Sequence, residues 1–101
     1  MSSFDRTIAE HRRLAILRVL SKAPGHSGNC SILTDATNHL GVAGTRDQVR
    51  GDMRWLDEQG LVTLEELRTL LVARITQAGL DVANGLSRRD GVKKPSPADS
   101  L

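Results

Sequence analysis

Residues 45–63 read TRDQVRGDMRWLDEQGLVT, and this stretch carries the clearest local signals of secondary structure in the chain. Thr45, with Gln48 three residues later, matches a capping box, in which two side chains bond the free backbone N–H groups at a helix start. Gly60 stands where a helix commonly ends in a left-handed residue, and the segment after it has the character of a strand. The stretch therefore predicts a helix over 45–59 that leads directly into a β-strand.

One face of this helix is apolar, and the flank beside it is basic. The predicted core contacts, which recur at helical spacing, are Val49, Met53 and Leu56. At about 100° per residue, Arg46, Arg50 and Arg54 form one ridge at the side of that apolar face. Arginine donates paired hydrogen bonds to guanine and also binds phosphate, so the ridge indicates contact with DNA.

The same ridge has a second interpretation, a solvated helix face. Acidic residues at helical spacing can neutralise the arginines and leave no binding site; these are Asp47, Asp57 and Glu58. If the helix does lie in a DNA groove, its first turn adds secondary polar contacts. The candidate DNA-binding residues are therefore Thr45, Arg46, Gln48, Arg50 and Arg54.

The flanking segments predict three further helices and a hairpin. Helices are expected over 5–22, 30–40 and 76–84, and strands over 61–66 and 70–75. Residues 23–29 contain a proline and two glycines, which predict a loop. Residues 87–101 have too few apolar groups to pack and predict a disordered basic tail. The expected organisation is one folded domain over 1–86 followed by that tail.

The helix expected over 5–22, with Asp5 as a possible cap, has more apolar surface than one core contact requires. Residues 14–20 read LAILRVL and are apolar at every position but one. A helix that faces a single core needs a stripe only about 100° wide. Either this is a central helix covered from several directions, or part of its surface meets a second subunit in a homodimer. The residues alone leave both interpretations open.

Composition excludes several kinds of site. The 101 residues carry 14 basic and 12 acidic side chains, so any DNA affinity must come from how charge is distributed. The single cysteine, Cys30, rules out an internal disulfide and a four-cysteine zinc site. The three histidines lie on different segments, so no metal site is expected. Only Phe4 and Trp55 are aromatic, which disfavours single-strand binding by stacked bases.

The sequence also lacks the patterns of an enzyme or a membrane protein. It shows no nucleophile with a matching base, no phosphate-binding loop and no carboxylate pair, so neither catalysis nor a cofactor is expected. No apolar run approaches the roughly 18 residues that a membrane span needs. The N-terminus shows no secretory signal. We therefore expect a cytoplasmic protein without a membrane partner.

The order of these elements and several short motifs resemble the winged helix-turn-helix superfamily. LDEQGLV at 56–62 looks like the common exit from the recognition helix into the wing. ITQAGL at 75–80 looks like the exit from the wing in MarR-, PadR- and ArsR-like regulators. RRLAIL at 12–17 and TRDQVR at 45–50 are similar to small winged-helix proteins of Mu-like prophages. The resemblance covers residues 5–86 and implies a mainly α fold with a two-stranded wing and a short C-terminal helix.

The resemblance implies a DNA-binding transcriptional regulator of phage or prophage type, whose third helix enters the major groove of double-stranded DNA. A dimer would read two half-sites. One feature opposes this interpretation: Glu65 and Glu66 lie near the wing tip with only Arg68 opposite, and paired acids repel the DNA backbone. The alternative is a winged-helix module for protein–protein contact or phage assembly that does not bind DNA specifically.

Overall fold

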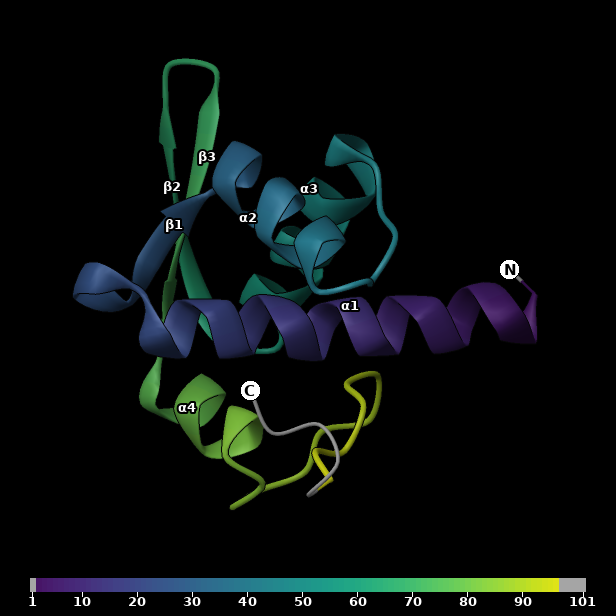
Figure 1. The fold of residues 1–101 in the computed structure, drawn as a ribbon. Helices are drawn as coiled ribbons and strands as arrows, with labels where there is room; N and C mark the ends of the chain where they lie inside the picture. The colour runs from purple at the N-terminus through teal and green to yellow at the C-terminus, as the bar shows by residue number, and fades with distance from the viewer. Residues whose placement is uncertain (1, 97–101) are drawn as a thin grey trace.

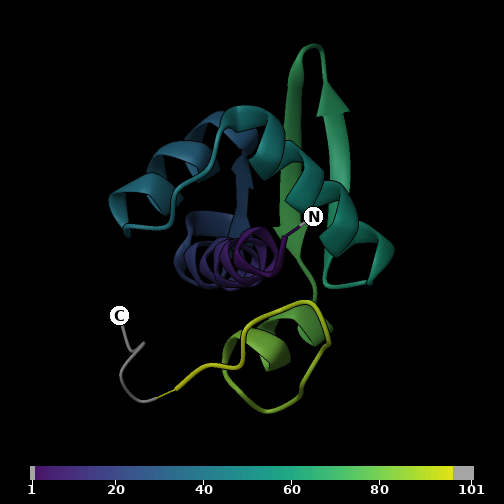
Figure 2. The ribbon, with the colours of Figure 1, turned by 90° about the vertical axis from the view of Figure 1, so that its right-hand side faces the viewer.

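Helix α1 (Ser3–Lys22) is the longest element, and the other elements pack on two sides of it (Figure 1). Helices α2 (Cys30–His39) and α3 (Arg46–Glu58) lie on one side with the sheet, and α4 (Gln77–Ala83) lies on the other (Figure 2). The computed structural model describes residues 2–96. Within that part of the chain, four α-helices and a three-stranded antiparallel sheet form a mixed α/β domain that is mostly helical.

The sheet has the strand order β1–β3–β2, with antiparallel neighbours. Strands β2 (Val62–Leu67) and β3 (Leu70–Ile75) form a hairpin that projects from the body (Figure 1). Strand β1 (Ser27–Asn29) pairs with β3 from Val72 to Arg74. The predicted loop over 23–29 and the predicted two-stranded wing are therefore both wrong. The sequence SGN has no alternating apolar pattern, and this short strand forms by pairing its backbone with the free edge of β3.

The hairpin closes through an unusual pair of turn residues, Arg68 and Thr69, between the opposed residues Leu67 and Leu70. Arg68 has a φ of 58°, a left-handed conformation that a side chain with a Cβ rarely adopts. Because the turn contains no glycine, asparagine or aspartate, the sequence could not fix its position. The first strand accordingly lies one residue later than the predicted 61–66.

The ends of α3 follow the caps that the sequence contains. The Thr45 hydroxyl accepts a hydrogen bond from the Gln48 backbone N–H at 3.1 Å, and the Gln48 side chain accepts one from the Thr45 N–H at 2.9 Å. The capping box is confirmed. At the other end, Gly60 has a φ of 76°, and the Leu61 N–H reaches back to the Leu56 carbonyl at 2.9 Å. This Schellman arrangement turns the chain straight from α3 into β2.

The first helix begins two residues earlier than predicted. Ser2 is the N-cap, and its hydroxyl accepts a hydrogen bond from the Asp5 N–H, so Asp5 lies in the first turn. Leu14, Leu17 and Leu20 are all buried within the chain, because α2, α3 and the sheet cover one side and α4 covers the other. The interpretation of a central helix is confirmed by this burial.

A single apolar core fills the space between α1, α2, α3 and the sheet. It includes the three predicted contacts of α3, all of them inaccessible to solvent. Cys30 is buried in the same cluster as a small apolar side chain. The largest fully buried apolar side chains from the remaining elements are Ile16, Leu17, Leu20, Leu33, Leu61, Val62, Leu71 and Val82.

Residues 87–96 lie against α1 and α3, although the sequence predicted a disordered tail from residue 87. The Lys93 backbone N–H donates to the Glu10 carbonyl at 3.1 Å. Arg89 Nη1 donates to the Gln59 carbonyl at 2.6 Å, and Val92 packs against the core. This segment therefore belongs to the same packed unit as the predicted 1–86 domain. The last part of the predicted tail, residues 97–101, lies outside the described residues.

Two glycine-to-alanine variants should test the packing of α4 against the segment that joins α3 to β2. A Cβ at Gly79 would lie closer than 3.0 Å to the Leu61 carbonyl oxygen, so Gly79→Ala forces backbone atoms apart. We expect a loss of about 1–3 kcal/mol in the free energy of unfolding, the usual effect of overpacking.

Gly51→Ala is the matched control, because Gly51 is exposed in the middle of α3 and an added Cβ meets no atom within 4 Å. Alanine there should raise stability by about 0.5–1 kcal/mol, the difference in helix propensity. Thermal unfolding followed by circular dichroism measures both variants. Equal shifts of one sign would contradict the packing described here.

Candidate nucleic-acid interface

The turn between α2 and α3 is fixed by side chains from two helices. Asn38 in α2 donates to the Gly44 carbonyl at 2.9 Å and accepts from the Gly44 N–H at 3.4 Å. Arg12 in α1 donates to the Ala43 carbonyl at 3.0 Å. A Cβ at Gly44 would collide with the Arg12 side chain, so the close approach requires glycine. These contacts set the position at which α3 begins.

The predicted contact residues lie on two different flanks of α3. Arg50 lies on one flank, and Gln48 lies about 160° away around the helix. Gln48 and Thr45 line a shallow groove of about 500 Å³ that also includes Asp5 and Arg12 of α1. The oxygens of Thr45 and Gln48 are engaged in the capping box, which leaves their hydroxyl and amide hydrogens as donors. The structure thus separates these two residues from the arginine ridge.

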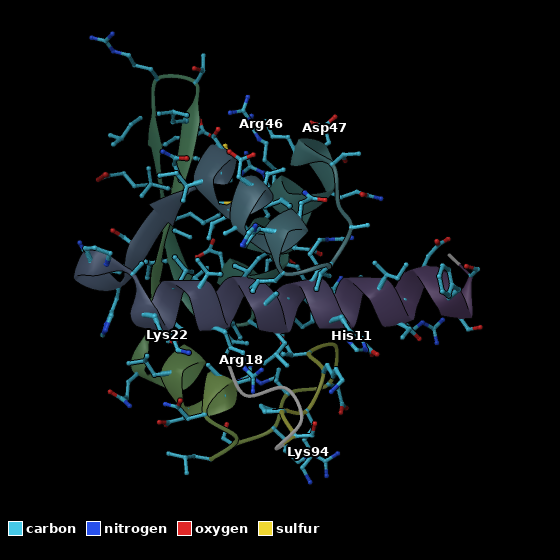
Figure 3. All side chains as sticks on the ribbon, viewed as in Figure 1. His11, Arg18, Lys22, Arg46, Asp47 and Lys94 are labelled. Carbon is cyan, nitrogen blue, oxygen red and sulfur yellow. The ribbon has the colours of Figure 1, made fainter. Side chains whose placement is uncertain are left out.

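The arginines of the ridge differ in exposure and in their partners. Arg46 at the start of α3 is exposed, and Figure 3 shows it beside Asp47 at the end of the molecule opposite α4. Arg50, one turn later, is half-buried. Arg54 is exposed, and its Nη2 pairs with Glu66 Oε1 at 3.1 Å. The partner of Arg54 is therefore on the hairpin, whereas the sequence suggested acidic residues of the same helix.

The strongest electrostatic feature near this surface is a buried ion-pair cluster. Asp52 in α3 is 4% exposed, and its carboxylate accepts from Arg12 Nε through one oxygen. The other oxygen accepts from Arg13 Nε at 3.1 Å. The two arginines are neighbours on α1, so one carboxylate fixes the crossing of α1 and α3. Among the described residues, no buried side-chain nitrogen or oxygen is left without a hydrogen-bond partner.

This cluster was not predicted from the sequence. The available signal was the position of Asp52, three residues after Val49 and four before Leu56, which places it on the buried face. A buried carboxylate requires a cationic partner. The sequence did not say which of its 14 basic residues would supply that partner.

Trp55 links the same cluster to the C-terminal segment. The guanidinium carbon of Arg13 lies 4.2 Å from the centre of the indole, which is a cation–π contact. Arg13 Nη1 also donates to the Gly91 carbonyl at 3.0 Å. Gly91 lies flat on the indole with a φ of 96°, where a Cβ would collide with the ring. Trp55 therefore packs within the chain, against Arg13 and the C-terminal segment.

Charge is unevenly divided between the two sides of α1. Residues 27–75, which form the sheet, α2 and α3, contain five basic and seven acidic side chains. Helix α1 and residues 76–96 together contain nine basic and four acidic ones. Glu65 and Glu66 lie exposed on the hairpin, as the sequence indicated for a wing tip. The α3 side is therefore not a generally electropositive surface.

Within residues 2–96, no three His, Cys, Asp or Glu side chains are grouped so that they could hold a metal ion. No helix in the described part of the chain is long and apolar enough to cross a membrane.

Comparison with known proteins places the chain among phage and bacterial sequences. It is 47% identical over 90 residues to the uncharacterised protein gp26 of Escherichia phage Mu, an alignment that covers 89% of this chain and 93% of gp26. It is 41% identical over 100 residues to an uncharacterised protein of Haemophilus influenzae, covering 98% of this chain and 96% of the relative. No family model matches the chain. No solved structure matches it either.

Two acid-to-amide variants should separate the buried ion pairs from the exposed one. Asp52→Asn removes the charge that satisfies two arginines at a buried site, and we expect it to destabilise the protein by about 3 kcal/mol or more. Glu66→Gln is the control, because its pair with Arg54 is more than half exposed and should contribute less than about 1 kcal/mol. Urea unfolding at pH 7 measures both. A loss for Asp52→Asn no larger than that for Glu66→Gln would refute the role given to the cluster.

Proposed function

Since the chain belongs to the same family as gp26 of Escherichia phage Mu, we propose that it is a winged helix-turn-helix protein that binds duplex DNA as a transcriptional regulator of a phage or prophage. In this proposal α3 enters the major groove. The observation that carries it is the presentation of α3: a tight turn fixed by Asn38 and Arg12 precedes an exposed, capped helix start that bears Arg46.

The arrangement of the elements supports a winged-helix architecture. The order is helix, short strand, two helices, hairpin and helix. The hairpin lies beside α3, and the Arg54–Glu66 pair joins the two. A reading helix with an adjacent wing is how such proteins approach duplex DNA. Strand β1 belongs to this arrangement, because it pairs with β3 at the base of the hairpin.

Recognition in this proposal depends on a few contacts. Arg46 and Arg50 are the residues best placed to donate to guanine O6 and N7 or to phosphate. Arg54 contributes only after it leaves Glu66, which lowers its value as a contact. The acidic hairpin reduces general attraction to phosphate. We therefore expect affinity on this side to depend strongly on sequence and weakly on overall charge.

A homodimer through α1 has a narrower basis than the sequence suggested. The leucines of α1 are covered within the chain, and Phe4, which is 71% exposed, is the large apolar side chain that its first turn presents. Contact through Phe4 would pair two copies so that each α3 reads one half-site. Sedimentation of the wild type and Phe4→Ser tests this contact, and a monomer at all concentrations contradicts it.

The DNA proposal predicts a defined pattern among arginine variants. Fragments that the protein selects from genomic DNA at near-physiological salt supply the operator. Arg46→Ala and Arg50→Ala should each weaken operator binding by about 1–3 kcal/mol and relax specificity at one base pair. Glu66→Gln should strengthen binding, because it removes an acid and releases Arg54. Fluorescence anisotropy with a labelled operator measures these changes.

The matched control is Arg74→Ala, which removes an exposed arginine on the sheet face opposite α3 and should leave operator affinity unchanged. If a variant lacking Arg46, Arg50 and Arg54 binds the operator as well as wild type, the site assignment is wrong.

A second candidate function is a protein-interaction or phage-assembly module on the same scaffold. The observation that favours it is the hairpin tip, where the opposed residues Leu67 and Leu70 are 51% and 38% exposed beside acidic side chains. The module predicts that no DNA fragment is retained at any salt concentration. It also predicts that the double variant Leu67→Ser, Leu70→Ser loses binding to the protein partner, whereas Arg50→Ala retains it. Changes at Trp55 or the α1 leucines cannot test it, because those side chains hold the fold together.

A further inference from the structure

We infer that the side of the molecule formed by α1 and residues 87–96 is a second DNA-contacting surface, which takes the phosphate backbone of a duplex without reading its sequence. We call this surface the basic face. Its exposed cationic residues include Lys22, Arg88 and Lys94. The surface lies outside the α3 interface proposed above, and Figure 3 shows Arg18, Lys22 and Lys94 on the side of α1 that carries α4, away from Arg46.

Apart from the buried ion pairs, positive charge is concentrated on α1 and residues 76–96. Arg12 and Arg13 pair with the one carboxylate of Asp52, and the cluster keeps a net charge of +1. Without them, α1 and residues 76–96 retain seven basic and four acidic side chains, while residues 27–75 retain five basic and six acidic ones. Phosphate attraction supplies most non-specific affinity for DNA. Among the described residues, α1 and residues 76–96 have the excess of positive charge that such attraction requires.

The cations of residues 87–96 are carried on a fixed backbone. Three hydrogen bonds tie this segment to the helices, at Arg89, Gly91 and Lys93. Arg88 and Lys94 are exposed on either side of these anchors. A charge held in place loses less conformational entropy on binding than one on a free tail. The anchored segment therefore presents its charges better than the disordered tail that the sequence predicted.

The basic face is hollowed, and it contains acidic as well as basic side chains. A hollow of about 420 Å³ lies between residues 87–95 and the neighbouring helices, and Arg88, Lys93 and Lys94 are among its lining residues. Glu10 and Asp90 also line it, so the hollow is not uniformly basic. A concave surface with several cations suits the regular spacing of backbone phosphates.

The chemistry favours duplex over single-stranded nucleic acid. Binding of single strands relies on aromatic side chains that stack with bases. The chain contains two aromatic residues, of which Trp55 is covered by Arg13 and Gly91, and Phe4 lies at the far end of α1. The basic face therefore offers charge without stacking, which fits the backbone of a duplex.

A bridging role between two DNA segments follows from the basic face, and this step rests on the proposed function of α3. Arg18, Lys22 and Lys94 lie on the side of α1 that carries α4, whereas Arg46 at the start of α3 lies on the other side (Figure 3). A straight duplex seated against α3 cannot also reach the basic face. One protein molecule would therefore bridge two DNA segments, one read by sequence and the other held by charge.

The test uses a labelled 30-base-pair duplex of random sequence and measures affinity across a range of salt concentrations. The double variant Arg88→Gln, Lys94→Gln should lower the slope of log Kd against log salt by about 2, since each lost phosphate contact changes it by about 0.9. The matched control, Arg68→Gln with Arg74→Gln, removes two exposed arginines from the hairpin side and should leave the slope unchanged. Circular dichroism confirms that both double variants remain folded.

Each outcome bears on one proposal or the other. An unchanged slope for Arg88→Gln, Lys94→Gln overturns the basic face, as does tighter binding of a single strand of equal length or no binding of random duplex by wild type at 50 mM salt. If Arg46→Ala and Arg50→Ala leave operator binding intact while the basic-face variant loses its slope, the α3 proposal fails and the basic face stands. If both sites hold, wild type joins a bead-bound operator to a labelled random duplex, and each set of variants abolishes that bridging.

Discussion

The buried carboxylate of Asp52 in α3 holds two arginines of α1, and through them it fixes the positions of α1, α3 and the C-terminal segment relative to one another. It draws two adjacent arginines of α1 into the interior, and those arginines extend to other parts of the chain. Arg12 reaches the turn before α3, and Arg13 reaches both Trp55 and the C-terminal segment. A charge removed from water is tolerated only when it is fully paired. The cluster therefore accepts one geometry of α1, α3 and residues 87–96 and rejects others.

This constraint also shapes both surfaces that bear on function. By fixing the turn at Ala43 and Gly44, it determines where α3 begins and how Arg46 is presented. By holding Gly91 on Trp55, it brings the cations of residues 87–96 onto the side of α1 opposite α3. Apart from the three charged residues of the cluster, residues 27–75 carry more acidic than basic side chains, and α1 with residues 76–96 carries more basic than acidic ones.

The acidic hairpin becomes understandable in the same terms. Glu66 faces α3 and pairs with Arg54, so one acid of the wing acts on the helix and not on solvent alone. Pairs of this kind are weak because both side chains are exposed. They can be exchanged for contacts with a ligand at little cost in free energy. The hairpin thus contacts one arginine of the ridge, and its tip carries the exposed side chains of Leu67 and Leu70.

Elements whose signals are local could be predicted from the sequence. The capping box at Thr45, the left-handed Gly60 and the spacing of Val49, Met53 and Leu56 fixed α3 and its exit into β2, because caps and helical periodicity involve residues within one or two turns. Features that depend on distant partners arise only when the chain folds. Strand β1 forms because β3 offers a free edge, and Arg54 is paired because the hairpin lies beside α3. Arg12 is buried because folding brings it to Asp52, 40 residues along the chain. No local pattern carries such pairings, since many surface charges compete for each buried one until the backbone brings one set together.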